Sequence, residues 1–122
     1  MIVRPKTTDP RLPEDGHAWG QLRQGFDYRV IGIEYGDYRI QSGSHNDQCP
    51  TLYSSKLFDM LDAQVEAAWI VDFGDDFENE QHLYIGFQEF REPGFWEDVH
   101  DGQKVALDVL NPILKGLGLN QC

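Results

Sequence analysis

The sequence predicts an α+β fold in which an antiparallel sheet of about four or more strands carries two helices on one face. Its 122 residues are the length of one domain, and 40% of them are hydrophobic and 12% aromatic, which is enough to build a core. Short runs of β-branched and aromatic residues alternate with turn-forming residues, as in strands joined by hairpins. Near the C-terminus, apolar residues recur instead with the 3.6-residue period of a helix.

The first 25 residues have no regular apolar pattern. Prolines stand at positions 5, 10 and 13, and a proline lacks the backbone N–H that a helix interior or a central strand needs. The sequence therefore predicts an extended, proline-containing arm over residues 1–25 and a single α+β domain over residues 26–122.

Four strands are expected, in two pairs. Residues 28–34 and 38–41 are joined by Gly36-Asp37, and glycine accepts the positive φ angle that a two-residue hairpin turn requires. Residues 67–73 and 83–90 also place alternating apolar residues on one face. The second pair is expected to form a hairpin with a polar, acidic tip between its strands.

Two helices are expected, over residues 54–62 and 103–115. A serine can cap the first, in which apolar residues recur at helical spacing. In the second, six apolar residues follow the helical period, and Pro112 is expected to kink or end the helix unless the pattern continues past it. One further helical turn is expected over residues 95–100, after a Pro-Gly break.

The negative charge is concentrated in one segment. The chain has 21 acidic against 10 basic side chains, a formal charge of −11. Residues 59–101 alone contain thirteen carboxylates and only one basic residue, Arg91. Such a surface repels nucleic-acid phosphates and anionic membranes, so neither is expected as a partner, and it favours a basic protein. The alternative is that the charge serves solubility alone.

The candidate partner-binding residues are carboxylates of this segment and the aromatic residues beside them. An exposed aromatic ring among carboxylates suits a cationic partner, although Phe95 and Trp96 can equally close one end of the core. The expected partner-binding set is Asp72, Asp75, Asp76, Phe77, Glu78, Glu80, Phe95, Trp96, Glu97, Asp98 and Asp101.

No catalytic residue, metal site or cofactor is expected. The acidic hairpin tip lacks the glycine and glutamate positions of an EF-hand loop. The histidines and cysteines do not have the paired spacing of a zinc site, and no Gly-x-Ser-x-Gly nucleophile motif or Gly-Lys-Ser/Thr phosphate loop occurs.

Compartment and thiol chemistry are predicted together. The chain contains no apolar run of membrane-spanning length and no N-terminal stretch typical of a signal peptide, so a cytoplasmic location is expected. Thiols are reduced there, so we expect Cys49 and Cys122 to be free rather than bridged.

A series of short motifs lies between residues 28 and 115: Tyr38-Arg39-Ile40, Pro50-Thr51-Leu52-Tyr53 before Leu57-Phe58 and Asp62, Trp69-Ile70-Val71, and Glu92-Pro93-Gly94-Phe95-Trp96-Glu97-Asp98 before His100-Asp101-Gly102. This pattern resembles small acidic bacterial immunity proteins of polymorphic toxin systems, of the contact-dependent inhibition, type VI and Rhs kinds. The resemblance implies a cytosolic antitoxin that binds one cognate toxin domain and blocks it, with no catalytic residues of its own. Nuclease toxins are commonly basic, which agrees with the acidic segment.

Three functions are therefore weighed. The first is an immunity protein that neutralises a basic toxin domain through its acidic clusters. The second is an acidic accessory protein or DNA mimic that has no toxin partner, and the third is a small enzyme or metal-binding protein whose site forms only in the folded chain. The sequence leaves the oligomeric state open.

Overall fold

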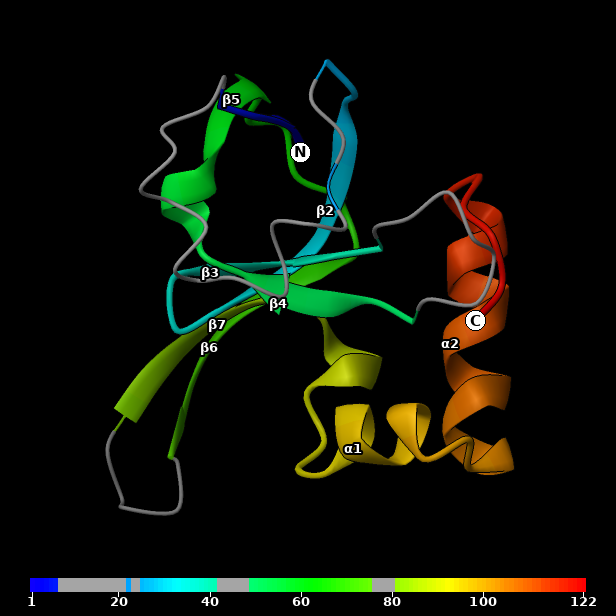
Figure 1. Cartoon of the computed structure of the whole chain (residues 1–122). Coiled ribbons are helices and arrows are strands. Elements are labelled where there is room, and N and C mark those ends of the chain that lie inside the picture. The colour runs from blue at the N-terminus through cyan, green and yellow to red at the C-terminus, as the bar shows by residue number, and fades with distance from the viewer. Residues whose placement is uncertain (7–21, 23–24, 42–48, 76–80) are drawn as a thin grey trace.

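The computed structural model describes residues 1–6, 22, 25–41, 49–75 and 81–122. In this part of the chain, seven strands form one antiparallel sheet and two helices follow near the C-terminus (Figure 1), so the predicted α+β fold is confirmed. Neither helix is long and apolar enough to cross a membrane. The strands are β1 (Ile2–Pro5), β2 (Tyr28–Glu34), β3 (Asp37–Ile40), β4 (Thr51–Tyr53), β5 (Phe58–Asp62), β6 (Trp69–Asp75) and β7 (Gln81–Phe87), and the helices are α1 (Phe95–His100) and α2 (Lys104–Gly116).

Strand β2 is the centre of the sheet. Along one edge it pairs with β3, and β4 follows beyond β3. Along the other edge, the start of β2 pairs with β1 and its end pairs with β7. The β1 side continues to β5, whereas the β7 side continues to β6, so the sheet divides into two branches. The β6–β7 hairpin extends away from the helices in Figure 1.

Strand β2 contains a bulge and contributes side chains to both sides of the sheet. Val30 pairs with Ile40 and Gly32 pairs with Arg39, which leaves Ile31 as an extra residue on β2. Adjacent side chains of a strand point to opposite faces of a sheet. Val30 and Ile31 accordingly reach two different cores.

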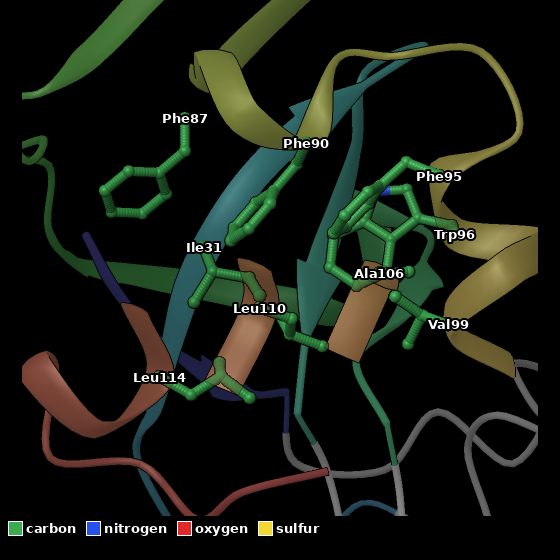
Figure 2. Close-up of a cluster of buried hydrophobic side chains, with 9 residues drawn as sticks. All are labelled: Ile31, Phe87, Phe90, Phe95, Trp96, Val99, Ala106, Leu110 and Leu114. Carbon is green, nitrogen blue, oxygen red and sulfur yellow. The ribbon is translucent and has the colours of Figure 1, made fainter. Parts of the chain in front are cut away.

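The two cores lie on opposite sides of β2. The helix-side core (Figure 2) joins the sheet to α1 and α2, and it consists of Ile31, Phe87, Phe90, Phe95, Trp96, Val99, Ala106, Leu110 and Leu114. The strand-side core joins β2, β3 and β4 to β1 and β5, and it consists of Val3, Val30, Ile40, Tyr53, Leu57 and Phe58.

Both predicted strand pairs are confirmed, and their boundaries shift by a few residues. Strand β2 spans residues 28–34 as expected, and β6 pairs with β7 from Trp69–Phe87 to Asp75–Gln81. The first hairpin turn differs, because Tyr35 and Gly36 have the positive φ angles and Asp37 already belongs to β3.

The helix predicted over residues 54–62 is wrong. A single 3-10 turn at Ser55–Leu57 is followed directly by strand β5. β5 pairs along its length with β1, more than fifty residues earlier in the chain. Helical spacing of apolar residues is a local signal, and here the pairing with a distant strand determines the conformation.

The N-terminal residues take part in the fold. Residues 2–5 lay within the predicted arm, but they form β1, which lies between β2 and β5. Val3 is completely buried in the strand-side core. Residues 7–21 and 23–24 of the predicted arm lie outside the described residues.

The two C-terminal helices agree with the expected ranges within a few residues. Gly94 has a φ angle of 79° and directly precedes α1. Helix α2 contains Pro112 and continues past it to Gly116. Leu110 and Leu114 on either side of the proline are fully buried, so packing compensates for the hydrogen bond that Pro112 cannot donate.

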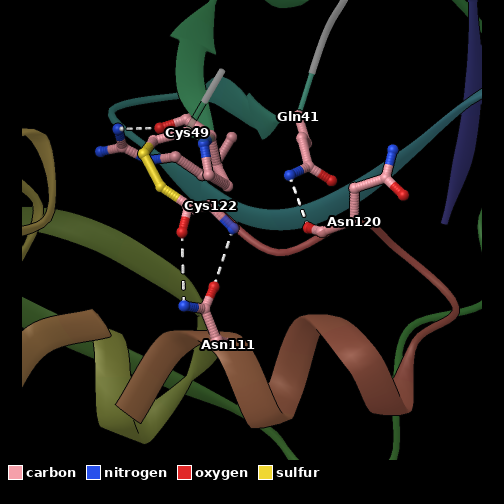
Figure 3. Close-up of a disulfide and its surroundings, with 7 residues drawn as sticks. Gln41, Cys49, Asn111, Asn120 and Cys122 are labelled. Carbon is pink, nitrogen blue, oxygen red and sulfur yellow. Dashed lines mark hydrogen bonds between the residues drawn. A yellow bond between two sulfur atoms is a disulfide. The ribbon is translucent and has the colours of Figure 1, made fainter. Parts of the chain in front are cut away.

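The prediction of free thiols is wrong, because Cys49 and Cys122 form a disulfide (Figure 3). Their Cα atoms lie 4.9 Å apart across 73 positions of sequence. The chain turns back after α2, where the backbone N–H of Cys122 donates to Oδ1 of Asn111 (2.8 Å) and Nε2 of Gln41 donates to the carbonyl of Asn120 (2.7 Å). This return of the C-terminal tail, which no local pattern shows, brings the two thiols together.

Candidate functional site

A pocket of about 610 Å³ opens on the helix side of the sheet. Side chains of β2, β3 and β7 form its floor, and residues 91–97, which lead into α1, form one wall. Its volume lies within the range that small-ligand and side-chain sites occupy. The pocket is therefore the principal candidate site in the described residues.

Two glycines lie on β2 and β7, strands that contribute side chains to this pocket. Gly32 and Gly86 are paired on neighbouring strands. A Cβ atom on Gly86 would lie 2.8 Å from the hydroxyl oxygen of Tyr84, whereas one on Gly32 would meet only ordinary contacts at 3.7 Å or more. The ring of Tyr84 thus crosses Gly86, and its hydroxyl donates to the carbonyl of Phe87 at 2.5 Å. Gly86 is required for this arrangement.

A buried ion pair lies at the base of the pocket. Nε and Nη2 of Arg39 donate to the same carboxylate oxygen of Glu34, at 2.9 and 2.7 Å. The guanidinium also lies over the ring of Trp96, 4.2 Å from its centroid. Arg39 is only 7% exposed, and burial lowers its pKa while Glu34 opposes that change. A buried charge pair is seldom required for stability, so its position in a pocket suggests a role in binding.

Tyr35 at the rim has an unusual backbone conformation. Its φ angle is 55°, which bulky side chains rarely adopt, and its side chain is 57% exposed. The ring stacks on His82 with 4.2 Å between centroids. Backbone strain of this kind concentrates at functional sites. The strained turn presents an aromatic surface at the mouth of the pocket.

The charges that line the pocket are unequally paired. Arg39 is paired with Glu34, and Arg91 is paired with Asp72 on β6. Glu92 and Glu97 are exposed and have no ion-pair partner among the described residues. Glu97 also interacts electrostatically with Arg39. The charged groups of the rim that have no ion-pair partner are therefore carboxylates, which makes the rim negative.

The sequence-predicted residues are distributed over several parts of the structure. Phe95 and Trp96 are buried in the helix-side core and line the pocket, so they are not free aromatic anchors. Asp72 binds Arg91 beside the pocket, and Glu97, Asp98 and Asp101 are exposed on α1 or at its end. Asp75 is the last residue of β6. The tip residues Asp76, Phe77, Glu78 and Glu80 lie outside the described residues.

Several pocket residues were missed from the sequence. Most occur singly in a strand or loop, and Arg39 and Glu92 lie in motifs that were not assigned to the site. The set is Glu34, Tyr35, Arg39, His82, Tyr84, Arg91 and Glu92. One local signal was present. Gly32 and Gly86 interrupt apolar strands, and a glycine inside a strand often marks a close approach of another group.

An apolar strip lies on the other face of the β6–β7 hairpin. Val71 is 67% and Phe73 is 65% exposed, and Leu83, which pairs with Phe73, is also exposed. The facing residues Asp72 and Tyr84 are directed to the pocket side instead. Exposed apolar side chains in contact with each other are typical of interaction surfaces.

The pocket is suited to binding by charge and by ring contacts. Its described lining contains no Ser, Thr, Cys or Lys side chain that could act as a nucleophile. Burial raises the pKa of the Tyr84 hydroxyl well above its usual range, so this group remains a hydrogen-bond donor at neutral pH. No cluster of three His, Cys, Asp or Glu side chains suitable for a metal ion occurs in the described part of the chain.

Comparison of the chain with protein-family models, with curated proteins and with solved structures finds no match.

Proposed function

We propose that the protein is an immunity protein that binds a basic toxin domain and blocks it. The observation that carries this proposal is the set of exposed, unpaired carboxylates on α1 and at the adjacent pocket rim. Glu97, Asp98 and Asp101 follow one another along this short helix and its end. A basic protein would neutralise them, which gives an electrostatic attraction of long range.

The carboxylates of α1 differ from those that form ion pairs within the molecule. Five basic side chains of the described residues form ion pairs within the molecule: Arg4 with Asp27, Arg29 with Glu66, Arg39 with Glu34, Arg91 with Asp72, and Lys104 with Asp108. The carboxylates of α1 have no such partner among the described residues. Unpaired like charges in proximity destabilise the folded state, so a surface that retains them is explained best by an external cation.

Exposed apolar contact area is available on the β6–β7 hairpin, on the face turned away from the pocket. The strip of Val71, Phe73 and Leu83 offers apolar surface on the β6–β7 hairpin, and stable interfaces combine an apolar centre with a polar rim. We propose that the toxin domain contacts α1 and this hairpin. This contact would cover the active site or substrate groove of the toxin.

The test is co-expression with the toxin domain encoded beside the gene. We expect the wild-type chain to protect cells and to associate rapidly, with an on-rate that falls as salt increases because the Debye length is about 8 Å at physiological ionic strength. Glu97→Lys/Asp98→Lys on α1 and Asp75→Lys/Asp76→Lys on the hairpin should each slow association by about tenfold or more.

A matched control separates local from general charge effects. Asp59→Lys/Asp62→Lys changes the net charge equally, but these residues lie on β5, at the opposite end of the molecule from α1 in Figure 1. This control should bind nearly as well as wild type. If both test variants fold, bind at wild-type rates at low and high salt and still protect cells, the acidic clusters serve solubility and the proposal fails.

The disulfide bears on where binding takes place. Disulfides persist in oxidising compartments and are rare in a reduced cytoplasm, so the bond between Cys49 and Cys122 is in tension with the predicted cytoplasmic location. That location remains a prediction. Alkylation of free thiols in intact cells, followed by mass spectrometry, tests it: modified Cys49 and Cys122 would support a reducing compartment, and protection of both would contradict it.

A further inference from the structure

We infer that the pocket beside α1 binds the side chain of one arginine residue of a protein partner. The inference deepens the proposed function and rests on it for the identity of the partner. Its chemistry rests on the pocket alone. Three features carry it: the unpaired charge at the rim, the aromatic surface at the mouth, and the fixed position of the ion pair at the base.

The charge at the rim selects a cation. The two basic groups of the lining are already bound, Arg39 to Glu34 and Arg91 to Asp72. An entering anion would therefore find no unpaired arginine and would meet the carboxylates of Glu92 and Glu97. An entering cation would find both carboxylates exposed and without ion-pair partners among the described residues.

The aromatic surface selects a planar cation. The ring of Tyr35 is exposed at the rim and stacks on His82. Tyr35 belongs to the β2–β3 hairpin turn, where its φ angle is 55°. A guanidinium stacks on aromatic faces and sheds water more readily than an ammonium group. Its flat set of N–H donors also matches carboxylates such as Glu92 and Glu97.

The base of the pocket already shows the same recognition within the chain. Arg39 is bound by a carboxylate on one edge and by the face of Trp96. Because Glu34 holds Arg39 at the base, the outer part of the 610 Å³ pocket remains open for a second guanidinium bound in the same manner.

The experiment uses small probes, so that it does not depend on a toxin. N-acetyl-arginine methylamide is titrated into the full chain, and binding is followed by NMR through the side-chain signals of Tyr35, His82 and Trp96. The citrulline analogue has nearly the same shape without the charge, the lysine analogue has the charge without the plane, and inorganic phosphate tests the opposite charge. We expect saturable binding of the arginine probe, with the citrulline probe weaker by about tenfold and the lysine probe intermediate.

Two double variants form a matched pair. Glu92→Gln/Glu97→Gln removes two negative charges from the pocket lining, and Asp98→Asn/Asp101→Asn removes two from neighbouring positions that do not line it. The first should weaken the arginine probe by about tenfold. Asp98→Asn/Asp101→Asn should leave the affinity for the arginine probe within about twofold, since exposed charges that do not contact the probe are largely screened.

Four results would each overturn the inference: absence of saturable arginine binding, equal binding of the arginine and citrulline probes, equal losses in the two double variants, or phosphate binding in place of arginine. The outcome is separate from that of the co-expression test. If the pocket binds arginine but the chain does not protect cells, the inference stands and the immunity function is refuted. If the chain protects cells but the pocket does not bind arginine, only the inference about the pocket is refuted.

Discussion

The two cores of the molecule differ in composition and in what they support. In the helix-side core, the ring of Phe90 lies 5.2 Å from the rings of both Phe95 and Trp96, and a disulfide crosslinks the adjoining C-terminal tail. The strand-side core is mostly aliphatic, includes Val3 from the first strand of the chain, and has no crosslink among its buried residues. Only the helix-side core reaches the candidate pocket, through Phe95 and Trp96.

The helix-side core both stabilises the fold and forms part of the pocket wall, whereas the strand-side core contributes no residue to the pocket lining. A change in the helix-side core alters both the free energy of unfolding and the shape of the pocket wall. A change in the strand-side core should alter the free energy of unfolding alone. This difference leads to three expectations, which differ in size.

The largest effect is expected from removal of the crosslink. Cys49→Ser/Cys122→Ser should lower the free energy of unfolding by about 4 kcal/mol, because closing a loop of this length restricts the unfolded chain. Urea unfolding monitored by circular dichroism measures the loss. The wild-type chain treated with a reductant is the control and should behave like the variant. A loss below about 1 kcal/mol would mean that the hydrogen bonds of the tail suffice without the bond.

Truncations in the two cores test the coupling directly. Leu110→Ala in the helix-side core should cost about 3 kcal/mol and Val3→Ala in the strand-side core about 2 kcal/mol, because both residues are fully buried. Chemical denaturation measures both losses. The NMR signals of Tyr35 and His82 should shift in Leu110→Ala and remain unchanged in Val3→Ala. Equal shifts in both variants would show that the two cores are not independent.

The smallest effect is expected at the pocket floor. Gly86→Ala places a methyl group against the ring of Tyr84 and should cost about 1–3 kcal/mol, as other overpacked sites do. Gly32→Ala is the matched control, since it meets only ordinary contacts on the paired strand. Thermal unfolding should therefore separate the two variants. Equal melting temperatures would show that the ring of Tyr84 moves aside at little cost.

The elements predicted correctly from the sequence are those with local signals. β2 and the β6–β7 hairpin follow apolar alternation, and α2 follows the helical period. The failures have a common physical cause. The helical prediction for β5 failed because its pairing partner, β1, lies more than fifty residues away. The disulfide was missed because it depends on a tail that turns back on α2. A local window contains neither contact.

The candidate site was predicted only in part, for the same reason. Acidic residues of α1 stand in one stretch of sequence, so their clustering was visible. The base of the pocket combines Arg39, Glu34 and Trp96, which meet only because β2, β3 and α1 come together in the fold. Phe95 and Trp96 were placed in the correct region, but whether they face solvent or the core is decided by packing.

The disulfide also changes what a protease can do to this protein. Because Cys49 is joined to Cys122, the main chain between them forms a covalent ring that contains β4 to β7 and both helices. One cut anywhere in that ring opens it without releasing a fragment. A nicked molecule would therefore migrate as one chain on a denaturing gel and separate into two pieces only after reduction.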